Sequence, residues 1–129
     1  MTEPILEHLR IAVEAAQDKK AEEIEVLDLR GMNGVTDYFL ICHGNSQRQV
    51  HAIVDAILKK TRDAKRRPAH VEGEGGAEWV LMDYLDFVVH VFVRDRRTFY
   101  SLEKLWAGAP RLEFPVPAAS AQADRRPGA

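Results

Sequence analysis

Apolar residues recur at helical spacing near both ends of the patterned part of the chain. Residues 4–19 carry one apolar stripe, Thr2 can cap the segment, and a proline in the first turn is tolerated. Residues 97–107 carry a similar stripe. The apolar positions are Ile5, Leu6, Leu9, Val13 and Ala16 in the first segment and Phe99, Leu102, Leu105 and Trp106 in the last. Both segments are predicted to form helices that pack one face on a core.

A third helix is predicted in the middle of the chain, where the start signal is clearest. Ser46 and Gln49 match a capping box, in which two side chains satisfy exposed N–H groups at the start of a helix. Apolar residues then follow at the spacing of a single buried stripe. They are Val50, Ile53, Val54, Ile57 and Leu58. The basic run at 65–67, directly before Pro68, indicates that the helix frays and ends there.

Five segments have the apolar content of β-strands: residues 23–29, 38–43, 69–72, 79–84 and 87–93. The segments 38–43 and 87–93 are almost unbroken apolar runs, which indicates burial on both faces and a central place in a sheet. The short link around Leu85 predicts a hairpin between the last two segments. The order α-β-β-α-β-β-β-α then predicts an α/β fold with a mixed five-stranded sheet packed by helices.

The length of 129 residues fits one domain, which we place at 1–114. From Pro115 onward Ala, Pro, Ser, Arg and Gly dominate, so 115–129 is predicted to be a disordered tail. The single cysteine, Cys42, cannot form an intrachain disulfide. Without a signal-peptide core, or an apolar run near the roughly 20 residues that span a bilayer, a cytoplasmic location with no membrane partner is expected.

The net charge of −2 argues against a generic binder of nucleic-acid phosphates, which needs a basic surface. It suits a protein that docks onto a basic partner, and direct sequence-specific nucleic-acid binding is not expected. One cluster of cations keeps an RNA-binding alternative open, although such a run is more often a solvated helix end. These cations are Lys59, Lys60, Lys65, Arg66 and Arg67.

The turn Gly44-Asn45-Ser46 leads from a buried strand into a helix, where backbone N–H groups can bind an anion. Ser46 already has a capping role, which favours a plain strand-to-helix turn. Asp83 and Asp86 are three residues apart across a turn, whereas a magnesium pair needs two carboxylates on one strand face. A small Mg-dependent nucleotidyltransferase that uses Gly44, Ser46 and Asp83 is the alternative function. The favoured interpretation has no cofactor, metal or small-molecule substrate.

The histidines are scattered and show no zinc-ligand spacing. His90 lies within an apolar strand, where a hydrogen-bonded histidine that lines the core or a sheet face is the favoured interpretation. Cys42 lies in a buried run and is interpreted as a small hydrophobe. Neither residue is assigned a catalytic or metal-binding role.

The segment 72–84 combines acidic residues, glycines and the aromatics Trp79 and Tyr84. Exposed aromatics with a rim of carboxylates are typical of a protein-binding hot spot. The alternative is that Trp79 and Tyr84 belong to the core. The pattern alone leaves both interpretations open.

A set of short motifs runs in order along residues 5–107. They are DLR at 28–30, TDYFLIC at 36–42, GNS at 44–46 with QV at 49–50, VEG at 71–73, EWVLMDY at 78–84, DFVVHVF at 86–92 and YSLEKLW at 100–106. Each motif alone is weak, but their order and spacing as a set are specific. In this set the chain resembles the Iojap-like family of ribosomal silencing factors. It departs from the family pattern at Leu85, where members usually carry glycine.

The resemblance implies a nucleotidyltransferase-like fold without the catalytic carboxylates. It also implies a non-enzymatic protein that binds the large ribosomal subunit through its fourteenth ribosomal protein, blocks association with the small subunit and represses translation. Because that partner is basic, the candidate contacts are acidic and aromatic residues around the predicted hairpin. They are Glu72, Glu78, Trp79, Asp83, Tyr84 and Asp86. Apolar strands and an exposed sheet edge also permit a homodimer.

Overall fold

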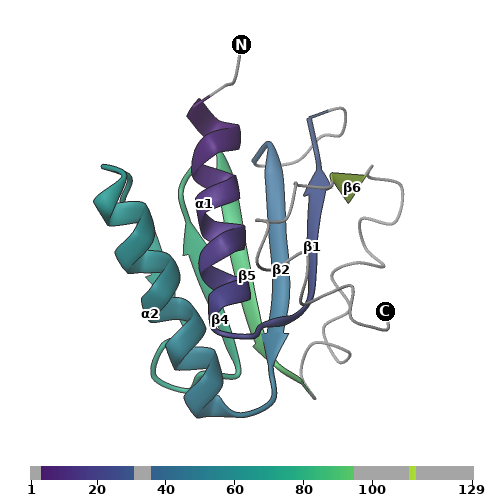
Figure 1. The fold of residues 1–129 in the computed structure, drawn as a ribbon, viewed down its shortest axis with the longest axis vertical. Coiled ribbons are helices and arrows are strands. Elements are labelled where there is room, and N and C mark those ends of the chain that lie inside the picture. Colours follow the sequence, from purple (N-terminus) through teal and green to yellow (C-terminus); the bar gives the residue numbers. More distant parts are fainter. Residues whose placement is uncertain (1–3, 31–35, 95–110, 113–129) are drawn as a thin grey trace.

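The computed structural model describes residues 4–30, 36–94 and 111–112 (Figure 1). Within them, the helix predicted at 4–19, the helix predicted after Ser46 and all five predicted strands are present. The elements are α1 Pro4–Asp18, β1 Glu22–Asp28, β2 Tyr38–Gly44, α2 Gln47–Asp63, β3 His70–Glu72, β4 Trp79–Asp83, β5 Phe87–Val93 and β6 Arg111–Leu112. Their bounds lie within one residue of most predicted bounds. The helix predicted at 97–107 and the tail predicted at 115–129 lie outside the described residues.

The sheet is mixed, as predicted, and its strands follow the order β3-β4-β5-β2-β1-β6. β2 and β5 run parallel, and the other neighbouring pairs are antiparallel. Every residue of β2 is buried and β5 is buried up to its last residue, which confirms that the two unbroken apolar runs are central strands. Within the residues that the structure describes, the sheet contains the five predicted strands and one additional short strand, β6. β6 has two residues, which is too short for a detectable alternation.

Both described helices pack on the same face of the sheet (Figure 1). Their apolar stripes meet alternate residues of the central strands, among them Leu40, Cys42, Val89 and Val91. The intervening strand residues form a smaller apolar cluster on the opposite face, which we call the second face. This cluster contains Leu27, Leu29, Phe39, Ile41, Val88 and Phe92.

Each helix ends in a closed C-terminal motif. At the end of α1, Lys20 has a positive φ of 63°, and the Ala21 N–H donates to the Ala16 carbonyl at 3.0 Å. At the end of α2, Lys65 has φ 67° and the Arg66 N–H donates to the Thr61 carbonyl at 2.8 Å. These are Schellman motifs, in which a left-handed residue turns the chain back onto the last helical carbonyls.

The predicted fraying of α2 at its basic run is therefore wrong. The Arg66 guanidinium lies 2.8 Å from the Tyr84 carbonyl oxygen and 2.8 Å from Asp86 Oδ2. Its side chain is 22% exposed, so the interpretation of a fully solvated helix end does not hold for this residue. Arg66 instead fastens the end of α2 to the β4–β5 hairpin.

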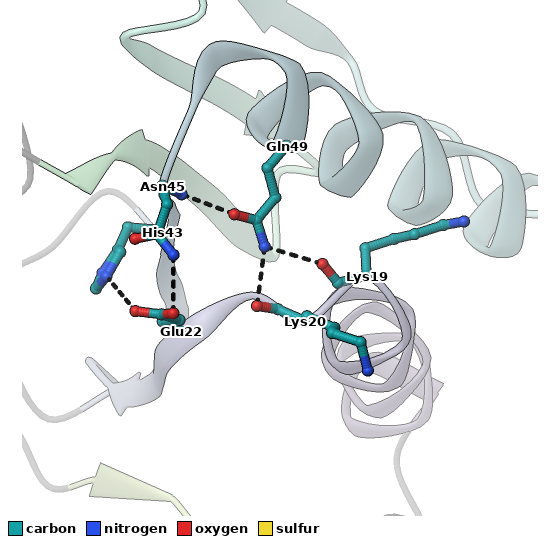
Figure 2. A network of polar contacts seen from close by, with 6 residues as sticks. All are labelled: Lys19, Lys20, Glu22, His43, Asn45 and Gln49. Atoms are coloured by element: carbon teal, nitrogen blue, oxygen red, sulfur yellow. Dashed lines mark hydrogen bonds and ion pairs between the residues drawn. The ribbon is translucent and has the colours of Figure 1, made fainter.

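The start of α2 is joined to the end of α1 through Gln49 (Figure 2). Ser46 Oγ accepts from the Gln49 N–H at 3.1 Å, which confirms the predicted cap. The reciprocal bond differs from a capping box, because Gln49 Oε1 accepts from the N–H of Asn45, at 2.7 Å. Gln49 Nε2 donates to the carbonyls of Lys19 and Lys20 at 3.1 and 3.0 Å.

Glu22 extends this network to the sheet (Figure 2). Its carboxylate accepts from Asn45 Nδ2 at 2.9 Å and lies 3.3 Å from His43 Nε2. The hydrogen bond from Asn45, followed by the contact with His43, holds the pKa of Glu22 below its usual range. The strand-to-helix turn at 44–46 is thus fixed by contacts within the protein.

Candidate functional site

Three of the predicted contact residues share the second face at the β3–β4 side of the sheet. Because side chains alternate along a strand, Trp79, Leu81 and Asp83 of β4 all point to that face. Glu72 of β3 is paired with Leu81, so its side chain lies on the same face. Glu72 is exposed and Trp79 and Asp83 are half-buried. We call Glu72, Trp79, Leu81 and Asp83 the β3–β4 surface.

Leu81 is the member of this surface that the sequence interpretation missed. It is half-buried and packs with Trp79 against the second-face cluster. Alternation within Trp79–Asp83 is the signal that could have found it, because Leu81 is two positions from both Trp79 and Asp83 and so must share their face.

The indole of Trp79 is held in one orientation. Its Nε1–H donates to His90 Nδ1 at 3.0 Å, and its ring stacks on Phe92 with centroids 5.2 Å apart. The rings of Phe39 and His90 form a T-shaped pair with centroids 4.6 Å apart. The prediction that His90 is a hydrogen-bonded histidine lining a sheet face is confirmed. These contacts leave part of the indole accessible while ordering the whole ring.

Burial lowers the pKa of His90 to about 3, so its ring is neutral at physiological pH. Since Nδ1 accepts the indole proton, the neutral ring carries its own proton on Nε2. A neutral imidazole is the form that can accept from Trp79. Protonation of His90 would turn this acceptor into a donor and break the bond.

Asp83 and Asp86 both act on the hairpin turn, through different partners. Asp83 Oδ1 accepts from the Leu85 N–H at 2.8 Å. Asp86 Oδ2 lies 2.8 Å from Arg66, and its side chain is 44% exposed. Leu85 has φ 73°, so the chain forms the left-handed turn here with a leucine. Both carboxylates are partly accessible and have an intramolecular partner.

The predicted contact role of Tyr84 is wrong. Its side chain is 1% exposed, its hydroxyl lies 2.9 Å from Thr61 Oγ1, and its ring stacks on Phe87 at 4.6 Å. Burial raises the pKa of the Tyr84 hydroxyl. Tyr84 faces the helices, because it is one position out of phase with Asp83 along the chain. The alternative interpretation, a core tyrosine, holds.

The remaining predicted contact, Glu78, precedes β4 and is exposed. Its carbonyl accepts from the Val93 N–H at 3.0 Å, which fixes the backbone beside the β3–β4 surface. Across 4–30, 36–94 and 111–112, no three histidine, cysteine or carboxylate side chains converge as metal ligands. In the same part of the chain, no helix has the length and apolar character of a membrane-spanning segment.

Comparisons with known proteins agree on one family. The family model described as "Ribosomal silencing factor during starvation" matches residues 2–128. The ribosomal silencing factor RsfS of Bacillus subtilis is 50% identical over 106 residues, covering 82% of this chain and 90% of that protein. RsfS of Halalkalibacterium halodurans is 47% identical over 108 residues, covering 84% and 92%.

Solved structures and a more distant relative extend this agreement. The crystal structure of a Chromobacterium violaceum protein superposes with a TM-score of 0.78 at 34% identity, covering 91% of this chain and 97% of that one. The mouse protein named "Mitochondrial assembly of ribosomal large subunit protein 1" is 32% identical over 97 residues, which are 73% of this chain and 42% of that protein. Family model, sequence relatives and fold coincide over most of the chain, which therefore belongs to the ribosomal silencing factor (RsfS) family.

Proposed function

We propose that this protein is a non-enzymatic regulator that binds the large ribosomal subunit through its fourteenth ribosomal protein and represses translation. Occupation of that site would block association with the small subunit. Family membership supports a role in silencing ribosomes, and the name of the mouse relative supports the large subunit as the partner.

The observation that carries this proposal is the ordered, half-buried indole of Trp79 beside accessible carboxylates. An aromatic ring that is already held by His90 and Phe92 loses little conformational freedom when it is covered by a partner. Such rings are enriched among the residues that dominate binding energy. Trp79 is thus suited to supply much of the affinity.

The carboxylates around Trp79 suit a basic partner. Glu72, Glu78, Asp83 and Asp86 are all at least partly exposed. Negative charge on this side speeds encounter with a cationic ribosomal protein and sets the orientation of docking. The same charge disfavours contact with the phosphates of ribosomal RNA.

Sedimentation with separated subunits and with joined ribosomes tests the function. We expect the purified protein to co-sediment with large subunits and to be absent from joined ribosomes. Addition of the protein to separated subunits should lower the yield of joined particles. Equal sedimentation with both particles, or with neither, would contradict the proposal.

Substitutions test the assignment of the surface. Trp79→Ala should weaken binding to the large subunit at least tenfold, the loss typical of a hot-spot aromatic. Asp83→Asn removes the charge but keeps an oxygen that can accept from the Leu85 N–H, so a loss of affinity would report charge alone. Asp55→Asn, at an exposed position of α2, is the matched control for loss of one negative charge. Thermal unfolding of each variant should show that the fold is retained.

A further inference from the structure

The hairpin turn between β4 and β5 displays a large apolar side chain. Leu85 is 66% exposed, and within the described residues it is the one large hydrophobic side chain classed as exposed. Its φ of 73° lies in the left-handed region, which is costly for any residue with a branched side chain. The Asp86 N–H donates to the Tyr84 carbonyl at 2.8 Å, which closes a γ-turn around Leu85.

Contacts from several elements hold this strained turn. Leu85 receives a bond at each main-chain polar group: Asp83 Oδ1 accepts from its N–H at 2.8 Å, and Thr36 Oγ1 donates to its carbonyl at 2.9 Å. Arg66 binds the residues on either side, at the Tyr84 carbonyl and Asp86 Oδ2. These contacts use the main chain of Leu85, and its side chain remains exposed. The turn is therefore stabilised independently of the side chain that it presents.

Strain of this kind persists where the surroundings over-determine it, and it is common at functional sites. A two-residue hairpin loop with positive φ is ordinarily served by glycine, asparagine or aspartate. A leucine here adds strain and exposes apolar surface, and neither effect stabilises the free protein. Binding to a partner would bury the exposed apolar side chain of Leu85 and so make it favourable in the complex.

We propose that Leu85 is a docking residue whose side chain inserts into an apolar pocket of the ribosomal protein that covers the β3–β4 surface. This inference rests on the proposed function and adds a second anchor to it. Asp83 belongs to the β3–β4 surface and also caps the Leu85 N–H, so the two features are continuous. From Trp79 to Asp83, β4 spans about 13 Å. Trp79 and Leu85, the two proposed anchors, therefore lie near opposite ends of one strand, and both fit within an interface of standard size.

The chemistry around Leu85 favours a protein pocket over ribosomal RNA. An aliphatic side chain has no hydrogen-bonding group for a base edge and no flat face for stacking. The neighbouring carboxylates of Asp83 and Asp86 disfavour contact with phosphates, and Asp86 is the more exposed member of its ion pair with Arg66. Apolar burial with a rim of charge is the usual pattern at a protein interface.

The test compares stability and affinity in the same variants of the full chain. Leu85→Gly should raise the midpoint of thermal unfolding, because glycine adopts positive φ readily. The same variant should bind large subunits and the isolated fourteenth ribosomal protein about five- to tenfold more weakly. Leu85→Asn should also bind more weakly while keeping the turn, because asparagine tolerates this φ but is polar. Leu85→Met should bind like the natural protein, because it keeps an apolar side chain.

A purely structural leucine cannot produce greater stability together with weaker binding. The docking role would be overturned if the natural protein binds large subunits and Leu85→Gly and Leu85→Asn bind them with the same affinity. The proposed function would then still stand. Failure of the natural protein itself to bind large subunits would remove the proposed function and this inference together. A difference between variants seen with protein-free ribosomal RNA, and absent with the isolated ribosomal protein, would also overturn it.

Discussion

Gly73 lies against the main chain of Trp79, so closely that a Cβ at position 73 would be 2.1 Å from the Trp79 carbonyl oxygen. Gly73 also has φ 90°, and its carbonyl accepts from the Ala77 N–H at 3.0 Å. The loop that leaves β3 therefore passes directly over the first residue of β4. This close approach places the backbone of Trp79 and with it one end of the β3–β4 surface.

Gly73→Ala should lower the free energy of unfolding by about 2–4 kcal/mol, because a Cβ both clashes with backbone and requires a disfavoured φ. Urea unfolding measures this loss. Gly75→Ala is the matched control, since a Cβ there meets nothing within 4 Å. Similar effects of the two substitutions would show that the close approach at Gly73 is not what constrains the loop.

His90 should make stability depend on pH. Its pKa is about 3 in the folded protein and near 6.5 in an unfolded chain, so the unfolded chain takes up the proton first as pH falls. The free energy of unfolding should therefore decrease below pH 6.5, by up to about 1.4 kcal/mol per pH unit, until the pH approaches 3. Glu22 and Asp28, whose pKa values are also lowered, add to this loss only below their ordinary values of 4.5 and 3.8.

Urea unfolding at several values between pH 7 and 5 measures the contribution of His90. His90→Phe should remove it, at the cost of an unpaired indole N–H on Trp79. His51→Asn, at an exposed position of α2, is the control that should leave the slope in place. An identical slope in the His90→Phe variant would contradict the assignment.

Gln49 should contribute more to stability than its half-exposed position suggests, because one side chain bonds three backbone groups in two separate turns. Gln49→Ala should lower the free energy of unfolding by about 1–2 kcal/mol. Gln49→Glu should recover at most a small part of this loss, because a carboxylate still accepts from the Asn45 N–H but has no N–H to donate to the carbonyls of Lys19 and Lys20. Arg48→Ala, exposed in the same turn, should change stability little. Equal losses at positions 48 and 49 would disprove this role.

Lys65 occupies the left-handed position of the Schellman motif at the end of α2. Lys65→Gly should raise the free energy of unfolding by about 0.5–1 kcal/mol, because glycine adopts φ near 67° without strain. Lys60→Gly, an exposed position inside the same helix, should lower it by about 1 kcal/mol. Thermal unfolding distinguishes the two signs, and a loss of stability in both variants would contradict the C-terminal motif.

Local patterns predict the regular elements and part of the surface. The period of 3.6 predicts α1 and α2, and unbroken apolar runs predict the central strands β2 and β5. Alternation in Trp79–Asp83 is sufficient to place Trp79 and Asp83 on one face. The same alternation places Tyr84 on the opposite face, so the hot-spot interpretation, which rests on its aromatic ring alone, is wrong for this residue. Composition indicates what a side chain can do, whereas phase along the strand decides where it points.

The amino-acid sequence by itself determines which segments are helix or strand and which side of each is apolar, since these properties depend on neighbours a few residues apart. Only the tertiary structure decides the roles of Arg66, Tyr84 and Leu85. Arg66 reaches Tyr84 across 18 residues, Tyr84 reaches Thr61 across 23, and Thr36 reaches Leu85 across 49. No local period encodes such pairs, because they form only when the packed sheet and helices bring distant segments together.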